Sequence, residues 1–409
     1  MPSGRFQRAR LARVLNYQDA RRQAKWALPR GVFEYVDGGT EDETTLRRNT
    51  AAFRELRFRP RMGIGVTDPQ TSVTLFGQEL SFPVLTAPCG GMKLIHPEAD
   101  IGVARAAAAA GTIHVASSMS GFSLEEIAEG SPGQHWFQLY KFRGRPGMEN
   151  LVYRAKAAGY QAIVATLDTQ VVSKREKDWR NGFSYSMRPN VANVLRLGPQ
   201  LAPHPFWIAR YVRDGMPFQV ANTVGMTRDG VPMQLSEVGQ RGATSSPSWE
   251  DLAWIRDNFD GPLLVKGVLT AEDCRRAREL GCDGVIVSNH GGRQLEGAPA
   301  TMDVLPEIVA AVGDQLEVLV DSGVRRGGDV LRALALGAKA VLVGRPYIWG
   351  LALAGQDGVS HMLELLRAEM TRSMLLLGLP SVHDLDPSWV EAYRRPAGPA
   401  PAGPAPAAR

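Results

Sequence analysis

The chain has 409 residues, of which 44% are hydrophobic and 22% charged, a composition typical of globular proteins and unlike that of disordered or fibrous chains. The net charge of +5 is concentrated at the N-terminus, because residues 1–30 hold eight Arg and Lys against the single acid Asp19. No basic stretch with interleaved aromatic residues occurs, which argues against a nucleic-acid partner. We interpret the basic arm as a solvated, partly helical segment, with contact to an anionic membrane surface as the alternative.

The cysteine pattern and the absence of long apolar runs indicate the compartment. Cys89, Cys274 and Cys282 form no CxxC pair, and such a sparse, odd count is typical of a reducing environment. No apolar run follows the basic N-terminus, as a signal peptide would require, and no 18 consecutive apolar residues occur. We therefore expect a cytoplasmic protein without a metal, with peripheral attachment to the inner face of the membrane as the alternative.

In chain order, we expect a helical arm and cap over residues 1–62, a main domain over 63–390, and a disordered Pro/Ala/Gly tail over 391–409. Eight short apolar runs in the main domain predict buried strands, over residues 83–87, 112–116, 136–140, 162–167, 263–268, 285–287, 318–320 and 340–343. Segments with helical patterns lie between most of them, over residues 98–110, 146–158, 249–258, 271–280, 304–312 and 328–336.

Eight strand–helix units predict an α/β protein with a closed (β/α)8 TIM barrel, N-terminal capping helices and one long insertion. The alternative is an open doubly wound sheet, which usually has fewer strands and a GxGxxG fingerprint after the first one. Here the first strand is followed by Ala87-Pro88-Cys89-Gly90-Gly91, which favours the barrel. The insertion after strand four, over residues 169–247, is interpreted as a lid, a membrane-contacting loop or an oligomer contact.

Polar or glycine residues follow each predicted strand, at the end where barrel enzymes place their active sites. In strand order they are Pro88, Cys89 and Gly90; Ser117 and Ser118; Gln138 and Tyr140; Thr166 and Asp168; Lys266; Ser288, His290 and Arg293; Asp321; and Gly344 and Arg345. So many polar groups at one rim are difficult to explain as core, and they predict a functional site.

Two residues of this rim point to a small acid anion as the substrate. His290 can accept a proton near neutral pH, and Arg293 can bind a carboxylate through two parallel hydrogen bonds. Asp168 would stabilise a protonated His290 if the two were in contact, although a purely structural hydrogen bond is the alternative.

The last loops and one lysine predict a phosphorylated, anionic cofactor. Glycines and arginines follow strands seven and eight, in Asp321-Ser322-Gly323-Val324-Arg325-Arg326-Gly327 and Val343-Gly344-Arg345, at the usual phosphate position of this barrel; ordinary glycine turns are the alternative. Lys266 at the end of strand five is costly to bury unless an anion meets it, and a reduced flavin would supply one. A lysine that reaches solvent is the alternative.

These residues resemble the family of FMN-dependent L-2-hydroxy acid oxidases and dehydrogenases, over about residues 17–387. The motifs that carry the resemblance are Glu34-Tyr35 with Gly38-Gly39-Thr40-Glu41-Asp42, Phe137-Gln138-Leu139-Tyr140, Thr166-Leu167-Asp168-Thr169, Lys174-Arg175-Glu176, Leu264-Val265-Lys266-Gly267, Ser288-Asn289-His290-Gly291-Gly292-Arg293-Gln294 and residues 321–327.

The resemblance implies a role for each matching residue. His290 would be the catalytic base with Asp168 behind it, Arg175, Arg293 and Tyr35 would bind the carboxylate, and Tyr140 would contact the substrate and stabilise the transition state. The FMN contacts would be Pro88, Cys89, Gly90, Ser117, Gln138, Thr166, Lys266 and Ser288, with Asp321 at the ribityl chain and Gly323, Arg325, Gly344 and Arg345 at the phosphate.

Two departures bear on substrate and acceptor. Met119 stands where glycolate oxidase has an aromatic residue, and a flexible Met neither demands nor forbids a small substrate. Gly90 matches mandelate dehydrogenase, where oxidases tend to have Ala. We therefore predict oxidation of L-lactate or a larger L-2-hydroxy acid, with a quinone or an electron carrier as acceptor.

Several alternatives remain. The nearest is an oxidase that reduces O2 to H2O2, and a more distant one is a flavoenzyme acting on a peptide-derived cofactor precursor. An FMN-dependent isomerase and a non-catalytic flavin-binding scaffold would leave the predicted catalytic residues without a use. The family resemblance also implies a homo-oligomer, namely a tetramer.

Overall fold

The computed structural model of the protein describes residues 9–181, 198–213, 219–227, 230–238 and 244–392. Eight parallel strands close into a barrel in the order β4-β5-β6-β8-β10-β11-β12-β13, with β13 returning to β4. The strands are β4 Val84–Thr86, β5 His114–Ser117, β6 His135–Leu139, β8 Ala162–Thr166, β10 Leu263–Val268, β11 Gly284–Val287, β12 Glu317–Val320 and β13 Ala340–Val343. The predicted (β/α)8 barrel is therefore confirmed.

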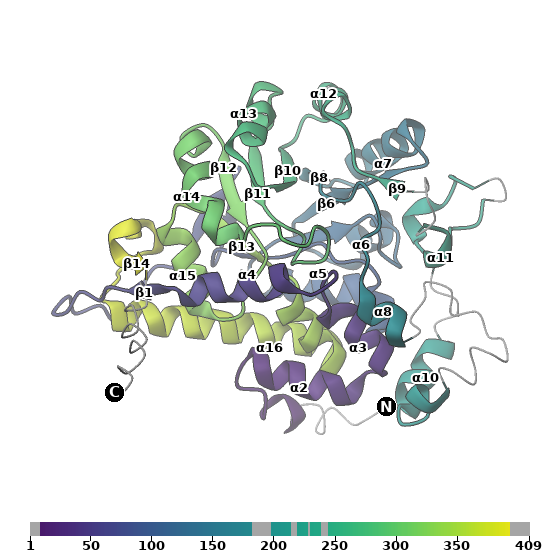
Figure 1. Cartoon of the computed structure of the whole chain (residues 1–409), viewed down its shortest axis with the longest axis horizontal. Coiled ribbons are helices and arrows are strands. Elements are labelled where there is room, and N and C mark those ends of the chain that lie inside the picture. The colour runs from purple at the N-terminus through teal and green to yellow at the C-terminus, as the bar shows by residue number, and fades with distance from the viewer. Residues whose placement is uncertain (1–8, 182–197, 214–218, 228–229, 239–243, 393–409) are drawn as a thin grey trace, which may run out of the picture.

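Helices surround this barrel (Figure 1). They are α5 Ala99–Ala109, α6 Leu124–Gly130, α7 Arg145–Ala157, α12 Trp249–Asn258, α13 Ala271–Glu279, α14 Thr301–Val312, α15 Gly327–Ala335 and α16 Arg345–Leu377. Six of them match the predicted helices within a few residues, whereas α6 and α16 were not predicted. Helix α16 is bent at Ala354 and Gly355, where the backbone leaves the helical region.

The strands are buried on both faces, which explains their continuous apolar character. Each residue of β5, β6, β8 and β13 is buried, as expected when helices cover one side of a strand and the barrel core fills the other. Side chains also cap the helices. Ser248 is the N-cap of α12, and its hydroxyl accepts a hydrogen bond from the amide of Asp251. Burial of the strands and capping of the helices together stabilise the barrel, which positions the residues at the C-terminal ends of its strands.

The N-terminal cap consists of α2 Tyr17–Ala27, α3 Arg30–Asp37 and α4 Thr44–Arg54. Strand β1 Leu56–Phe58 pairs with β14 Val390–Ala392, which corrects the predicted start of a disordered tail at residue 391. The backbone of 391 and 392 is held by this antiparallel ladder. The rest of that tail, residues 393–409, lies outside the described residues.

The insertion contains α8 Glu176–Asn181, α10 Pro205–Arg213, the 3-10 turn η2 Ala221–Thr223 and α11 Leu235–Val238. Its end returns to the barrel as β9 Thr244–Ser245, which pairs with β7 Lys141–Phe142, and a further hairpin joins β2 Val73–Leu75 to β3 Gln78–Leu80. Short turns η1 Met92–Leu94, η3 Val382–Asp384 and η4 Pro387–Trp389 complete the described elements.

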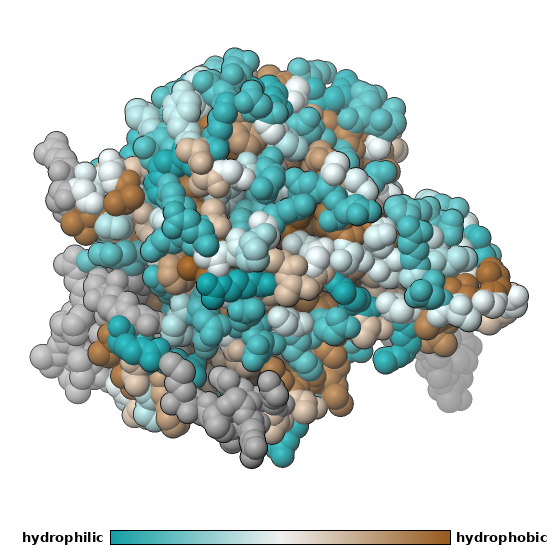
Figure 2. All heavy atoms as spheres, turned by 180° about the vertical axis from the view of Figure 1, so that it is seen from behind, coloured by the Kyte–Doolittle hydropathy of each residue, from teal (hydrophilic) through white to brown (hydrophobic). Residues whose placement is uncertain are grey.

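Figure 2 shows the face of the molecule that is turned away from the viewer in Figure 1. The described part of this face is mostly hydrophilic, with hydrophobic residues in small separate groups.

Candidate active site

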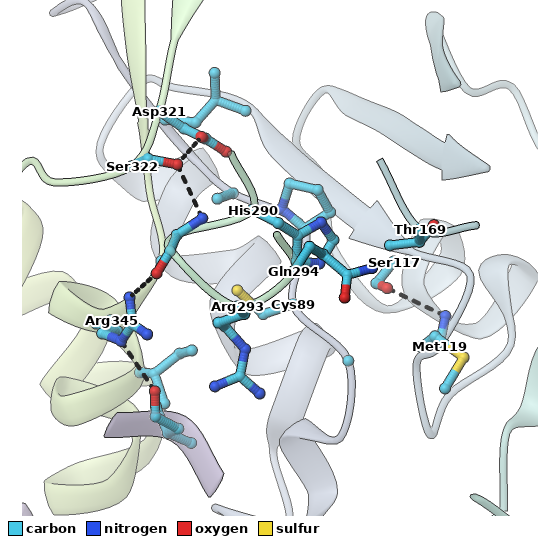
Figure 3. A pocket seen from close by; sticks show the side chains of 18 of the residues that line it. Cys89, Ser117, Met119, Thr169, His290, Arg293, Gln294, Asp321, Ser322 and Arg345 are labelled. Carbon is cyan, nitrogen blue, oxygen red and sulfur yellow. Dashed lines mark hydrogen bonds between the residues drawn. The ribbon is translucent and has the colours of Figure 1, made fainter. Parts of the chain in front are cut away.

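One large pocket lies at the C-terminal ends of the barrel strands. Predicted site residues from all but one of the strands, together with the cap and the insertion, line it: Tyr35, Pro88, Cys89, Gly90, Ser117, Tyr140, Arg175, Lys266, His290, Arg293, Asp321, Gly323, Arg325, Gly344 and Arg345. Figure 3 shows part of this set around a single cavity, with Arg345 at one end and Ser117 and Met119 at the other. The structure thus brings together side chains that are spread over more than 300 positions of the chain.

The four remaining predicted residues lie directly behind the lining and contact it. The amide of Gln138 accepts a hydrogen bond from the Ser117 hydroxyl at 3.2 Å and donates one to the Thr166 hydroxyl at 3.1 Å. Ser288 accepts a hydrogen bond from Lys266, and Asp168 contacts His290. Each residue is therefore placed so that it can orient a group that faces the pocket.

His290 and Asp168 form a hydrogen-bonded pair, with Nδ1 of the imidazole 2.9 Å from Oδ1 of the carboxylate. Because an ionised carboxylate only accepts, Nδ1 carries the proton and Nε2 is left as the basic nitrogen. His290 has a left-handed backbone, at φ 59°, which is unfavourable for a non-glycine residue and is typical of functional sites. A glycine at 267 is required beside this pair, because a Cβ there would lie 2.6 Å from Cγ of Asp168.

The charge state of Asp168 follows from two opposed effects. Burial by itself would raise the pKa of this carboxyl group, but the electrostatic attraction of His290, its hydrogen bond and the charge of Lys266 lower the pKa overall. Asp168 is consequently a carboxylate at neutral pH. It can orient the imidazole and stabilise the positive charge that the imidazole gains when it takes a proton.

Two guanidinium groups converge on the ring of Tyr35. Arg293 lies 5.2 Å and Arg175 5.4 Å from the ring centroid, within the range of a cation–π contact. Burial, followed by the nearby charge of Arg293, lowers the pKa of Arg175. Two neighbouring guanidinium groups favour a bound anion, and Asp178, at 3.5 Å from Arg175, balances part of their charge.

Tyr140 faces the same part of the pocket and remains a neutral hydrogen-bond donor. Burial and then the charge of Asp168 raise the pKa of this phenol, so that it does not ionise at physiological pH. Its backbone amide donates to the hydroxyl of Ser118 at 3.2 Å, which fixes the start of the loop after β6.

Lys266 is a buried ammonium group with two partners. Its Nζ lies 2.9 Å from Oδ2 of Asp321 and donates a hydrogen bond of 2.7 Å to the Ser288 hydroxyl. Burial would lower the pKa of Lys266, but the charges of Asp321 and Asp168 raise it overall. The lysine therefore stays protonated beneath the pocket and supplies a fixed positive charge to any group that lies over β10.

The far end of the pocket is formed by the start of α16 and the loop after β12. Gly344 is the residue before the first turn of α16, so backbone N–H groups and the positive end of the helix dipole face this space. Gly323 has φ 123°, and a Cβ there would lie 2.4 Å from the carbonyl oxygen of Asn49, so only glycine fits.

Two arginines flank this end. The guanidinium of Arg345 donates to the carbonyl oxygens of Val36 and Gly38, both at 2.9 Å, and of Gly291 at 3.1 Å. Burial, with the charges of Arg325 and Arg293, lowers the pKa of Arg345 to about 10. Arg325 lies 4.8 Å from the ring centroid of Tyr17. A phosphate group between two such arginines would remove much of their mutual repulsion.

Several lining residues were not predicted as site residues, although Thr169, Gln294 and Ser322 lie within the motifs that carry the family resemblance. The full set is Val36, Ala87, Met119, Thr169, Val171, Val172, Ser173, Val238, Gly291, Gln294, Ser322, Val324, Leu342, Val343 and Ile348. Ser322 is the most connected of them, because its hydroxyl donates to Asp321 at 2.6 Å and accepts from the amide of Gly291 at 2.9 Å. It links the loops after β11 and β12, as the dashed lines in Figure 3 show.

Comparison with known proteins decides the family. A family model described as FMN-dependent dehydrogenase matches residues 24–392. The chain belongs to this family. Its cofactor is accordingly FMN.

Several known proteins are similar to this chain over nearly its whole length. An L-lactate oxidase of Nostoc sp. is 40% identical over 380 residues, which are 92% of this chain and 98% of that protein. A pre-mycofactocin synthase of Mycobacterium tuberculosis is 40% identical, over 90% of this chain and 92% of that protein. A crystal structure of monotopic membrane protein (S)-mandelate dehydrogenase has a TM-score of 0.87 and 38% identity, covering 93% of this chain and all of the other.

The residues that line the pocket are suited to FMN at both of its ends. Lys266 is a buried positive charge that would meet the negative charge of a reduced flavin ring. Arg325, Arg345 and the first turn of α16 would hold the phosphate at the usual anion site of this barrel. The glycine-rich loop after β4 and Ser117 also line the pocket, and Ser117 donates to Gln138 behind it; these groups would contact the ring.

Proposed function

We propose that this protein is an FMN-dependent dehydrogenase that oxidises an L-2-hydroxy acid, L-lactate or a larger analogue, to the 2-oxo acid. The observation that carries the proposal is the His290–Asp168 pair, at 2.9 Å, in the same pocket as Arg293, Arg175 and Lys266. A base, a carboxylate-binding pair and a positive charge for the flavin are the groups that this reaction needs.

Each side chain would have a separate task. Arg293 and Arg175 would bind the carboxylate, and Tyr35 and Tyr140 would donate or accept hydrogen bonds at the substrate oxygens. Nε2 of His290 would take the proton from the substrate hydroxyl, and Asp168 would stabilise the resulting imidazolium. FMN, when bound, would accept the two electrons together with the hydrogen that leaves the substrate carbon. Fixing the acid against these groups supplies a large part of the rate acceleration.

The direct test is anaerobic mixing of the FMN-loaded enzyme with a panel of L- and D-2-hydroxy acids, followed by flavin absorbance. We expect bleaching by L-acids and none by their D-enantiomers. If no 2-hydroxy acid bleaches the flavin, the proposal is wrong.

As the electron acceptor we propose a quinone or a separate carrier. Gly90 faces the pocket, and a Cβ at this position would lie 2.6 Å from Cβ of Met119, so the alanine common in oxidases does not fit without a shift. The rival is an oxidase that uses O2, the activity named for the Nostoc relative. Oxygen uptake with peroxide formation, compared with reduction of a soluble quinone, separates the two.

A substrate derived from a peptide, as the name of the Mycobacterium relative suggests, is a weaker candidate. Arg175 and Arg293 both line the pocket here, and this pair is suited to a small carboxylate. An FMN-dependent isomerase would not require it.

We also propose peripheral contact with a membrane, through α10. Phe206 and Val212 of this helix are 71% and 57% exposed, and Arg210 and Arg213 lie in its last turn. The helix is anchored to the barrel by Trp207, whose indole N–H donates to the carbonyl of Leu94 at 2.8 Å. An amphipathic helix with exposed apolar residues and basic residues is suited to an anionic bilayer surface.

Two further observations bear on this contact. No helix within the described ranges combines the length and the hydropathy needed to cross a bilayer. Helices α10 and α2 lie along the same lower edge in Figure 1, and Trp26 of α2 is 80% exposed. Sedimentation with anionic liposomes at low salt tests the proposal, which fails if the protein stays in the supernatant.

We further propose a homo-oligomer, with a tetramer as the expected state. Light scattering coupled to size-exclusion chromatography measures it directly, and a monomer would refute it.

A further inference from the structure

The long insertion contributes an apolar wall to the pocket. Val171 and Val172 at its start and Val238 on α11 line the cavity together with Met119 of the loop after β5. Val171 and Val172 are 76% and 55% exposed, whereas Val238 is only 3% exposed. The wall thus has two valines open to solvent at the mouth and one valine buried within the insertion.

The insertion is fixed to the rim by a buried asparagine. The side-chain amide of Asn222 donates to the carbonyl oxygens of Ser117 and Ser118, both at 3.4 Å, and its oxygen accepts from the amide of Leu124 at 2.8 Å. Asn222 is completely buried, and an amide so placed is costly to leave unpaired. The insertion is therefore held against the same loop that carries Met119.

Hydrogen bonds continue from this anchor to the wall. The amide of Met233 donates to the hydroxyl of Thr223 at 2.7 Å, and the amide of Val220 donates to the carbonyl of Met233 at 2.8 Å. The amide of Val238 in turn donates to the carbonyl of Gln234 at 3.1 Å. This connected path places Val238 at a fixed position relative to β5.

We propose that Val238 is a specificity-determining residue, and that the enzyme prefers 2-hydroxy acids with a branched aliphatic side chain over lactate and over diacids. This inference rests on the proposed function. With the carboxylate at Arg293, the hydroxyl at His290 and the hydrogen toward the flavin, the fourth substituent of the carbon must point to the remaining wall.

The chemistry of that wall defines the substituent. Val238, Val172 and Met119 are aliphatic, and burying a carbon chain against them is favourable. Among the described lining residues, the positively charged ones are those already assigned to substrate carboxylate, base or cofactor, so a second carboxylate would lie against aliphatic side chains without a cationic partner.

The first experiment compares three acids on the FMN-loaded enzyme. We expect kcat/KM for L-2-hydroxyisocaproate to exceed that for L-lactate by at least about tenfold, because each buried methylene contributes to discrimination. We expect L-malate to be at least about a hundredfold poorer than L-2-hydroxyisocaproate. A value for lactate or malate equal to that for hydroxyisocaproate would overturn the inference.

The second experiment assigns the preference to Val238. Val238→Ala is expected to lower kcat/KM for hydroxyisocaproate by about three- to tenfold and for lactate by less than about twofold, while Val238→Ile keeps the wild-type preference. Val224→Ala is the matched control, because Val224 lies in the same insertion, is 42% exposed and does not line the pocket. An equal loss with both acids, or no loss with either, would refute the assignment.

The two proposals fail in different ways. If no 2-hydroxy acid reduces the flavin, the proposed function is wrong. If lactate reduces it readily without preference for the larger acid, only the role of Val238 is wrong. The flavin content and the thermal unfolding of each variant report whether it has folded.

Discussion

Nδ1 of His290 and Oδ1 of Asp168 lie 2.9 Å apart, although the two residues are separated by 122 positions in the chain. The contact exists because β8 and β11 flank β10 in the barrel, so the loops at their ends meet over it. One residue of the pair faces the pocket and the other lies behind it, which is the arrangement of a base and its orienting carboxylate.

Replacement of the base should abolish flavin reduction without loss of FMN. We expect His290→Gln to slow anaerobic reduction by about 10²–10⁴-fold, because a neutral amide cannot take the substrate proton. Stopped-flow absorbance measures the rate, and the flavin-to-protein ratio is the control. A variant that reduces its flavin as fast as the wild type would refute the role of His290.

Arg293→Lys should chiefly weaken binding of the acid. One guanidinium nitrogen of Arg293 already donates to the carbonyl oxygens of Tyr35 and Gly38, at 2.6 and 2.9 Å, which fixes the group in place. Lysine lacks the planar pair of donors, so we expect KM to rise by about ten- to a hundredfold. Titration of the flavin spectrum with oxalate measures affinity independently of turnover, and unchanged affinity would contradict the assignment.

Removal of the buried ammonium group should leave Asp321 without its ionic partner. Lys266→Met is expected to lower FMN occupancy, since an unpaired buried carboxylate costs about 3–5 kcal/mol. The double variant Lys266→Met/Asp321→Asn removes the unpaired charge and should recover part of the occupancy. The flavin-to-protein ratio after gel filtration measures both, and equal occupancy in the two variants would show that the pair is not coupled.

Loss of a phosphate-binding arginine should discriminate between FMN and riboflavin. We expect Arg325→Ala to raise the Kd of FMN by at least about tenfold, because the variant loses the binding free energy of one charge-assisted hydrogen bond. Riboflavin lacks the phosphate, so its affinity should change by less than about twofold. Quenching of flavin fluorescence measures both constants, and a parallel loss of the two affinities would place Arg325 away from the phosphate.

A buried acid outside the pocket makes stability depend on pH. Asp100 is fully buried, and the contacts of its carboxyl group with Ser120 and with its own backbone only partly offset the loss of water. Burial raises the pKa of Asp100 from 3.8 to about 6, so the folded protein keeps a proton that the unfolded chain releases. Stability therefore falls as pH rises from about 4 to 6, and a penalty of about 3 kcal/mol remains above that range.

The variant Asp100→Asn removes the ionisation and should raise Tm at pH 8 but hardly at pH 4. Thermal unfolding of the FMN-loaded protein at the two pH values measures the difference. Equal shifts at both pH values would show that the pKa of Asp100 does not differ between the folded and the unfolded protein.

The sequence alone was sufficient for the barrel. Buried parallel strands are short apolar runs, and the helices between them have their own periodicity and end signals, so local patterns predicted all eight strands. Helices α6 and α16 were missed, since α6 is short and α16 is buried along much of its length without a clear polar face. Residues at the strand ends could be identified because the barrel topology brings all those ends to one rim.

Only the tertiary structure decided how the rim residues pair and what covers them. The contacts of His290 with Asp168 and of Lys266 with Asp321 depend on the order in which strands close the barrel. The carbonyl of Gly38 accepts from both Arg293 and Arg345, and no local pattern marks such a group. Val238 reaches the pocket through a chain of contacts anchored at Asn222, because the path of a long insertion is set by distant partners rather than by its own periodicity.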